Sequence, residues 1–257
     1  MDLAEELKER ADMDLFGVAD AEVYEAKAPP NHRPSDFMKD ARSIVLIGTR
    51  LLDLPLDGIP ETRTEYTVNF HMSNTHLNHT LFELGSYLQA RGHKVFPIPY
   101  LEMPGWNLEK GSAGMLKALR HLVTLPRIHD VVMAALWENL SFRHMAAEAG
   151  LGEIGVNNLL LTPEHGARVR FVALLTDADL PGGKPLEPGL CQPEQCDYAC
   201  VKACPANALS EDGSATDKAA CLKYYIKLGL PGMSGVRCGL CVAECPVYKA
   251  SFREKKE

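Results

Sequence analysis

The chain has 257 residues, of which 46% are hydrophobic and 24% are charged, and its formal net charge is −7. This length is enough for one large core, or for a core with a small appended module. Residues 1–190 carry a net charge of −8 and residues 191–257 carry +1. The sequence therefore lacks the strong basic excess of nucleic-acid binding proteins, and nucleic acid is not an expected partner.

The N-terminal segment, MDLAEELKERADMDL, alternates charged and apolar side chains at helical spacing. It lacks the uninterrupted apolar run that a signal peptide or a membrane span requires. The twin-arginine pair that directs prefolded cofactor proteins to export is also absent from the sequence. We therefore expect a soluble, cytoplasmic protein without membrane contact.

The first hundred residues predict helices that alternate with strands. Residues 2–12 have helical spacing, and residues 15–19 and 43–48 are short apolar runs typical of buried strands. A long helical pattern covers residues 64–91, and residues 94–100 follow as a strand. This order predicts an α/β arrangement.

The middle of the chain predicts two further helices and one strand. Residues 108–122 and 130–149 have helical spacing, and residues 168–176 (RVRFVALLT) are typical of a strand. Residues 181–193 hold four prolines and three glycines, which is typical of a linker. We place the domain boundary in this linker.

All eight cysteines follow residue 190, in the run CQPEQCDYACVKACP, at one isolated position, and in the run CGLCVAECP. They are Cys191, Cys196, Cys200, Cys204, Cys221, Cys238, Cys241 and Cys245. Their clustering divides the chain into an N-terminal α/β domain, residues 1–185, and a C-terminal domain, residues 186–257.

Two Cys-Pro motifs in one short segment are typical of a ferredoxin-type module with two [4Fe–4S] clusters. In such modules the cysteine before each proline binds the other cluster. This rule assigns the first cluster to Cys191, Cys196, Cys200 and Cys245, and the second cluster to Cys204, Cys221, Cys238 and Cys241. Tetrahedral four-cysteine zinc sites are the alternative for such motifs, whereas disulfides fit a cytosolic chain poorly.

The segment GLGEIG, residues 150–155, matches the dinucleotide-binding pattern GxGxxG. That pattern needs a strand before it and a helix after it. Here the preceding SFRHMAAEA predicts a helix, and Pro163 follows eight residues after the last glycine. We therefore do not expect a Rossmann dinucleotide site.

The run AGLGEIGVNNLLLTPEHGARVRFVALLTDADL, followed by the double Cys-Pro motif, resembles the core shared by epoxyqueuosine reductases and corrinoid reductive dehalogenases. Weaker similarity extends towards the N-terminus, in GVAD, RPSDFMKDARSIVLIG and YTVNF. The resemblance implies an α+β fold. A nitroreductase-like α/β domain would bind cobalamin, and a C-terminal ferredoxin-like module would reduce it through two [4Fe–4S] clusters.

The resemblance also implies which residues contact the corrin and its side-chain amides. They lie in two stretches and comprise Asn157, Asn158, Leu159, Leu160, Arg168 and Arg170. Gly150, Gly152 and Gly155 would let the backbone approach the ring. Plain core packing is the alternative explanation for the leucines.

The sequence departs from both families. Val156 stands where reductive dehalogenases commonly carry Arg, and those proteins are usually longer and exported, so we do not expect organohalide respiration. The chain ends at Glu257, without the helical-repeat extension by which epoxyqueuosine reductases bind tRNA. Where those reductases have an Asp proton donor, this sequence has Leu136, Trp137 and Glu138.

Glu138 and Tyr66 are the candidate proton donors. The alternatives are a solvated helical glutamate and a tyrosine that caps a helix face. His71, His76 and His79 lie near one another on the predicted helix over residues 64–91, where two imidazoles could approach one ligand, or where all three have only a structural role.

These features predict an enzyme, an iron–sulfur and cobalamin-dependent reductase that acts on a small organic substrate. An external donor such as ferredoxin or flavodoxin would supply the electrons, and the cofactor would carry the chemistry. Two alternatives stay open. One is an electron-transfer protein that reduces a corrinoid on a partner protein, and the other is a truncated epoxyqueuosine reductase, against which the acidic N-terminal part weighs.

Overall fold

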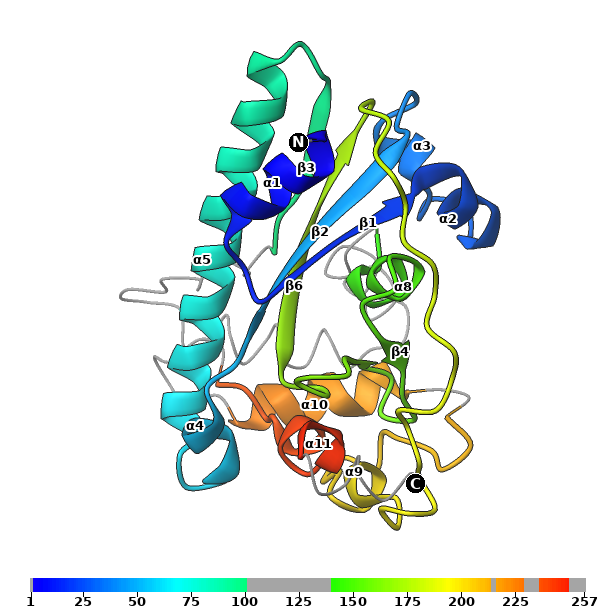
Figure 1. The fold of residues 1–257 in the computed structure, drawn as a ribbon. Coiled ribbons are helices and arrows are strands. Elements are labelled where there is room, and N and C mark those ends of the chain that lie inside the picture. The colour runs from blue at the N-terminus through cyan, green and yellow to red at the C-terminus, as the bar shows by residue number, and fades with distance from the viewer. Residues whose placement is uncertain (1, 101–139, 214–215, 229–235, 250–257) are drawn as a thin grey trace, which may run out of the picture.

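The computed structural model describes residues 2–100, 140–213, 216–228 and 236–249. They form a mixed α+β fold around a four-stranded antiparallel sheet (Figure 1). The strands are β1 (Leu15–Asp20), β2 (Ser43–Arg50), β3 (Val95–Ile98) and β6 (Val169–Thr176), in the order β1-β2-β6-β3. All four were predicted from the sequence, and the structure confirms them.

The central strand β2 is apolar because helices cover both faces of the sheet. Val45 and Ile47 pack with residues of α1 (Leu3–Ala11) and α5 (Arg63–Ala90). Ile44 and Leu46 point to the opposite face, where α2 (Ala21–Lys27) and α8 (Phe142–Glu148) lie. Each of these four side chains is at most 1% exposed. Burial of one such side chain stabilises the fold by about 1.5–3 kcal/mol.

The longest helix, α5, has 28 residues and follows one side of the sheet along its length (Figure 1). Leu77, Leu81, Leu84 and Leu88 are buried at the spacing of one helix face, and they pack with β2 and β6. The helix α1 begins after Asp2, whose carboxylate accepts the backbone N–H of Glu5 at 2.8 Å and so caps the first turn. Both helices confirm the predictions for this part of the chain.

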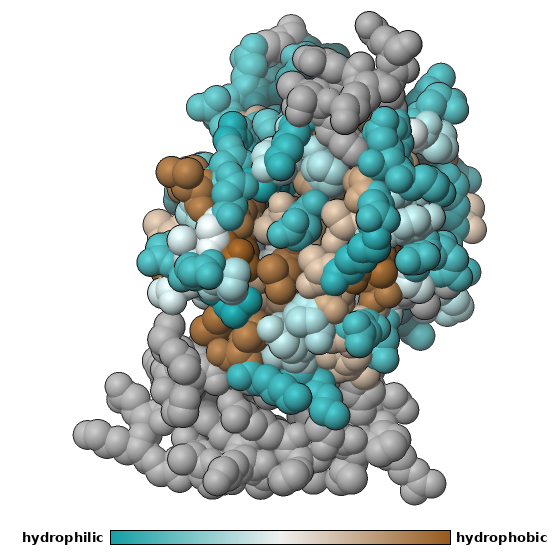
Figure 2. All heavy atoms as spheres, turned by 90° about the horizontal axis from the view of Figure 1, so that it is seen from below, coloured by the Kyte–Doolittle hydropathy of each residue, from teal (hydrophilic) through white to brown (hydrophobic). Residues whose placement is uncertain are grey.

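The shorter elements shape the lower end of the molecule as drawn in Figure 1. They are α4 (Asp53–Asp57), β4 (Glu153–Ile154), β5 (Leu160–Leu161), α9 (Ala199–Lys202), α10 (Lys218–Leu228), α11 (Leu240–Ala243) and the 3₁₀ turn η1 (Pro246–Tyr248). The short helix α3 (Pro34–Phe37) lies next to α2, near the upper end (Figure 1). From below, hydrophobic residues gather between polar ones on the face that the picture presents (Figure 2). Among the described helices, none has the length and apolarity needed to cross a bilayer.

The predicted helix over residues 130–149 is wrong at residues 140–141. The helix α8 begins at Phe142, and Ser141 before it has extended backbone angles of φ −94° and ψ 105°. A Ser at this position favours a helix start over a helix interior, because its side chain competes for backbone hydrogen bonds. The earlier part of this prediction and the predicted helix over residues 108–122 lie outside the described residues.

Candidate functional site

Four of the eight cysteines line one cavity. They are Cys191, Cys196, Cys200 and Cys245, the four that the ferredoxin rule assigns to the first cluster. Val156, Asn157 and Leu161 from the N-terminal part of the chain close one side of the same cavity, and Gln192, Pro246 and Val247 complete the lining. The cavity therefore lies where the hairpin of β4 and β5 contacts the cysteine-rich segment after residue 190.

Sharp turns in the left-handed backbone region precede the short helices that present the thiols. Asp197 and Tyr198, directly before α9, both have a φ of 52°. Cys200 is the second residue of α9 and is buried. Gly239 has a φ of 71° directly before α11. Left-handed angles cost free energy at residues other than glycine, so the packing of the loop must hold Asp197 and Tyr198 in place.

The four thiols of the first set lie close enough for the charge of one to raise the pKa of another. Burial, together with the charges of Cys191 and Cys196, raises the pKa of Cys200 to about 11 and that of Cys245 to about 12. These thiols are therefore protonated at neutral pH unless a metal or a cluster binds them.

The other four cysteines form a second electrostatic group. Burial raises the pKa of Cys221, Cys238 and Cys241, and the charge of Cys204 adds to the shift at all three. The charge of Cys200 also raises the pKa of Cys241, so the two groups are neighbours. In the described part of the chain, no three His, Cys, Asp or Glu side chains are grouped so as to hold a single metal ion. The eight cysteines fit two ferredoxin-type clusters, and the ligand assignment stays a prediction.

The glycines of GLGEIG face atoms of this chain. A β carbon at Gly152 would lie 2.2 Å from the carbonyl oxygen of Leu161, and one at Gly150 would lie 2.4 Å from that of Lys184. Gly155 abuts the Leu161 side chain, where a β carbon would lie 2.7 Å from Cδ1. The absent side chains thus allow the hairpin of β4 and β5 to close, and the approach of a corrin ring to these glycines stays a prediction.

The residues of the hairpin turn bind the cysteine-rich segment. Asn157 is 4% exposed, accepts the backbone N–H of Leu159 at 3.2 Å and donates to the carbonyl oxygen of Cys241 at 3.4 Å. Asn158 has a φ of 58°, which makes the turn, and Leu160 is buried in the core that contains α8. In the structure these predicted corrin contacts connect the hairpin to the rest of the chain.

Three hydrogen bonds beside the first cavity were missed by sequence reasoning. The carboxylate of Glu153 accepts the backbone N–H of Gly189 at 2.6 Å and, through a short hydrogen bond, the N–H of Cys191. The backbone N–H of Val156 points to the sulfur of Cys191 at 3.5 Å. The sequence signalled the Glu153 contact only by an acidic residue within GLGEIG. The partner, Cys191, lies 38 positions away, so no local pattern connects the two residues.

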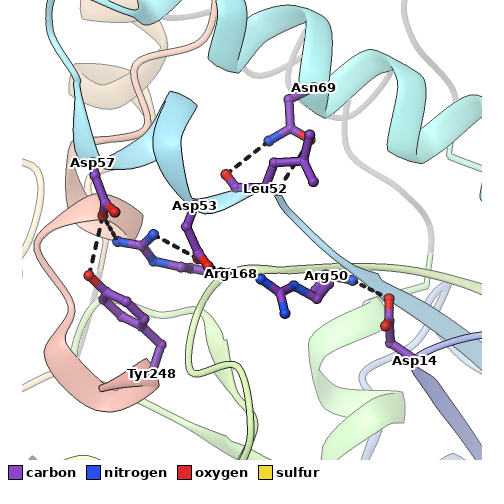
Figure 3. Close-up of polar contacts among 8 residues, drawn as sticks. All are labelled: Asp14, Arg50, Leu52, Asp53, Asp57, Asn69, Arg168 and Tyr248. Carbon is purple, nitrogen blue, oxygen red and sulfur yellow. Dashed lines mark hydrogen bonds and ion pairs between the residues drawn. The ribbon is translucent and has the colours of Figure 1, made fainter. Parts of the chain in front are cut away.

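Arg168, a predicted corrin contact, has other partners in the structure (Figure 3). It is 2% exposed and forms ion pairs with Asp53 at 3.0 Å and Asp57 at 2.6 Å, both from α4. Its guanidinium carbon lies 3.5 Å from the ring centroid of Tyr248, whose hydroxyl donates to Asp57 at 3.2 Å. Arg168 also donates to the carbonyl oxygen of Ala243 at 3.4 Å. This network fixes the segment around Cys245, the last cysteine of the chain, against α4 and β6.

Arg170, the other predicted cationic contact, lies in an aromatic cluster. Its guanidinium carbon is 4.2 Å from the ring centroid of Phe70, and that of Arg237 is 4.3 Å from the same centroid. Arg237 also donates to the hydroxyl of Tyr100 at 2.9 Å. Because Arg237 directly precedes Cys238, this cluster places positive charge beside the second cysteine group.

Tyr66, a candidate proton donor, is 3% exposed and lies against the second cysteine group. A β carbon at Gly239 would lie 2.4 Å from its ring, so only glycine fits there. Burial raises the pKa of the Tyr66 hydroxyl far above its usual value, so the phenol is neutral at physiological pH. Its role as a proton donor stays a prediction.

The remaining sequence candidates contribute no described site. Glu138 lies outside the described residues. His76 and His79 are exposed on α5, where His79 pairs with Glu83 at 3.5 Å, and the ring of His71 packs against Phe70. In the described residues these three histidines do not form a group of metal ligands.

No protein-family model matches the chain. The tetrachloroethene reductive dehalogenase of Desulfitobacterium hafniense is 34% identical over 115 residues, which are 39% of this chain and 21% of the dehalogenase. An epoxyqueuosine reductase of Gloeobacter violaceus is 31% identical over 167 residues, 60% of this chain and 46% of the reductase. The matched region thus spans less than half of these relatives.

Two solved structures share the fold over nearly the whole chain. Epoxyqueuosine reductase from Bacillus subtilis aligns with a TM-score of 0.56 and 18% identity, over 96% of this chain and 66% of the reductase. A catabolic reductive dehalogenase in complex with 3-bromo-4-hydroxybenzoic acid aligns with a TM-score of 0.62 and 18% identity, over 97% of this chain and 33% of the dehalogenase. By sequence in part and by fold nearly throughout, the chain is homologous to epoxyqueuosine reductases and reductive dehalogenases.

Proposed function

We propose that this chain is an iron–sulfur reductase that binds two [4Fe–4S] clusters and passes single electrons to a reaction centre in its N-terminal α+β domain. The observation that carries this proposal is the cavity lined by Cys191, Cys196, Cys200 and Cys245. One wall of that cavity comes from the β4–β5 hairpin, so a cluster bound there would contact the N-terminal domain directly.

The two cysteine groups support a two-cluster module. Each group combines at least one cysteine of the first motif with at least one of the last motif, which is the interleaved ligation of two-cluster ferredoxins. We also propose that residues 1–185 form a nitroreductase-like domain and residues 186–257 a ferredoxin-like domain.

Cobalamin is the cofactor that we propose for the reaction centre, because one homologous fold belongs to a reductive dehalogenase described as performing B12-dependent dehalogenation. When bound, cobalamin would supply the reductive chemistry of its cobalt. In the described structure, Asn157 and Arg168 are bonded to the chain itself and the glycines of GLGEIG face its own atoms. These contacts do not show a corrin pocket, so cobalamin binding rests on the homology and we derive no step through the cofactor.

The expected partners follow from this role. The clusters need a one-electron donor, for which we propose a small redox protein such as a ferredoxin or a flavodoxin in the cytoplasm. The substrate that we propose is a small organic molecule. An electron carrier that reduces a corrinoid on a partner protein would use the same clusters, and the cobalt content of the purified protein distinguishes the two.

The test is anaerobic purification from cells supplied with iron and cobalamin, followed by absorption spectroscopy and quantification of iron, zinc and cobalt. We expect about eight irons per chain, because two four-iron clusters require them, and one cobalt. Cys200→Ser and Cys221→Ser should each lower the iron content by about half, because they remove ligands of different clusters. Iron without cobalt would point to the electron carrier, and zinc in place of iron would contradict the proposal.

A further inference from the structure

Glu153 holds the first ligand segment of the first cluster by its backbone. Both carboxylate oxygens accept N–H groups from this segment, one from Gly189 at 2.6 Å and one from Cys191 itself. Hydrogen bonds to an ionised acceptor are roughly twice as strong as neutral ones. The carboxylate therefore fixes the backbone of Cys191, the first in the chain of the four cysteines that line this cavity.

The charge of Glu153 has no neutralising partner in the described part of the chain. The side chain is half-buried, and none of the ion pairs found among the described residues includes it. A carboxylate next to a group of thiolates is repelled by them. Burial is the main cause that raises the pKa of Cys191, and the charge of Glu153 adds to it, so the carboxylate and this sulfur are electrostatically coupled.

The same repulsion acts on the cluster. Reduction adds one negative charge to the cluster, and a fixed carboxylate beside it makes that addition less favourable. In addition, Glu153 takes the N–H of Cys191, which otherwise could donate to a sulfur of the cluster, and hydrogen bonds to the sulfurs are among the factors that set the potential. Both effects lower the reduction potential.

We propose that Glu153 is a positioning residue that fixes Cys191 and lowers the reduction potential of the cluster bound by Cys191, Cys196, Cys200 and Cys245. This inference rests on the proposed function, because it requires that a cluster binds there. The second cysteine group lies beside Arg63, Arg237 and Asp217, and the hydrogen bonds of the Glu153 carboxylate in the described residues go to Gly189 and Cys191, not to this group. The effect should therefore be confined to one cluster.

The experiment is a redox titration of the anaerobically purified full chain with dithionite, followed by electron paramagnetic resonance. Cys200→Ser identifies which signal belongs to the first cluster. In Glu153→Gln, which removes the charge and keeps the shape, the potential of that cluster should shift upwards, while the second cluster keeps its potential. Glu194→Gln is the matched control, because that carboxylate also acts on Cys191 but is exposed, and solvent screens it. Its shift should be much smaller.

Glu153→Asp keeps the charge on a side chain shorter by one methylene, so its potential should stay nearer to that of the wild type than the potential of Glu153→Gln. Equal shifts in the Gln and Asp variants, equal shifts of both clusters, or unchanged potentials would each overturn the proposal. Loss of all iron from both variants alike would show that Glu153 serves only folding, and would also overturn it. A wild-type chain without iron would instead refute the proposed function.

Discussion

Arg168 is a buried cation whose two partners, Asp53 and Asp57, are 44% and 46% exposed. Arg168→Met would remove one ion pair from each carboxylate and the contact with the Tyr248 ring, while Asp53 would keep its pair with Arg50 and Asp57 its hydrogen bond from Tyr248. We expect a loss of about 2–3 kcal/mol, because breaking a buried pair is costly but the half-exposed aspartates regain water. Arg168→Lys should recover only part of this loss, since an ammonium group cannot reproduce the planar guanidinium fork.

The measurement for Arg168 is thermal unfolding of the iron-loaded protein, in which this loss corresponds to a Tm decrease of roughly 5–10 °C. Arg42→Met is the matched control. Arg42 pairs with Asp179 at 2.8 Å, but both side chains are more than half exposed, and such a pair contributes at most about 1 kcal/mol. Equal effects of the two Met substitutions would contradict the role of Arg168 in the network.

The raised pKa values of the buried cysteines predict a pH dependence of metal binding. In the metal-free protein, Cys200 and Cys245 hold their protons up to about pH 11 and 12. A metal binds the thiolates, so binding releases protons and its apparent affinity rises with pH by roughly tenfold per pH unit for each proton released.

Titration calorimetry of Cd²⁺ binding to the metal-free protein between pH 6.5 and 8.5 would test this dependence, with Cd²⁺ as a thiophilic probe. Buffers of different ionisation enthalpy give the number of protons released. Cys245→Ser should release one proton fewer, because one thiol is lost. An affinity that does not change with pH would show that these thiols are already ionised in the folded protein.

At the scale of elements, the β4–β5 hairpin joins the two parts of the chain. Its strands have two residues each, yet it contributes Val156, Asn157 and Leu161 to the first cavity. Two residues per strand give little stability by themselves, so the close backbone contact at Gly152 must hold the hairpin in shape.

Gly152→Ala should therefore destabilise the protein by about 3 kcal/mol and lower its iron content, because the added β carbon would overlap the carbonyl of Leu161. Gly85→Ala is the matched control in α5. There the new β carbon would lie 3.6 Å from Leu174, an ordinary contact, and Ala in a helix interior should stabilise the protein by about 1 kcal/mol. Urea unfolding and iron quantification measure both effects, and loss of stability in both variants would contradict this account.

At the scale of the whole molecule, the cysteine-rich segment shares two cores with the rest of the chain. Leu161 and Ala167 are buried together with Cys245 and Val247, and Tyr66 and Phe70 pack with side chains of α11. The sheet region has its own cores, which contain no residue after Leu180. Cluster binding should therefore stabilise the lower end of the molecule more than the sheet.

Metal removal tests this difference. After the clusters are removed with a chelator and an oxidant, residues 191–213, 216–228 and 236–249 should lose protection from amide hydrogen exchange, while β2 and β6 should keep most of theirs. Mass spectrometry of exchange in the loaded and metal-free proteins measures both regions in one experiment. Equal loss of protection in the sheet would show that the whole chain folds as one unit around its clusters.

The sequence by itself determined the elements with strong local patterns. The strands β2 and β6 and the helix α5 were predicted because their side chains repeat with a clear period, and the cysteines were found because the Cys-Pro spacing is itself specific. The start of α8 was missed because two residues at a helix end carry no periodic signal.

Only the tertiary structure decided which groups meet. Arg168 and Asn157 were selected through a resemblance, but their partners Asp53, Asp57 and Cys241 lie 115, 111 and 84 positions away. Likewise, Glu153 accepts the backbone N–H of Cys191, which lies on the other side of the linker in the sequence. Local periodicity reports which face of an element is buried, whereas pairing between distant charges depends on how the elements pack. For that reason the cysteines that are the candidate cluster ligands could be identified from the sequence, and the residues that hold them in place could not.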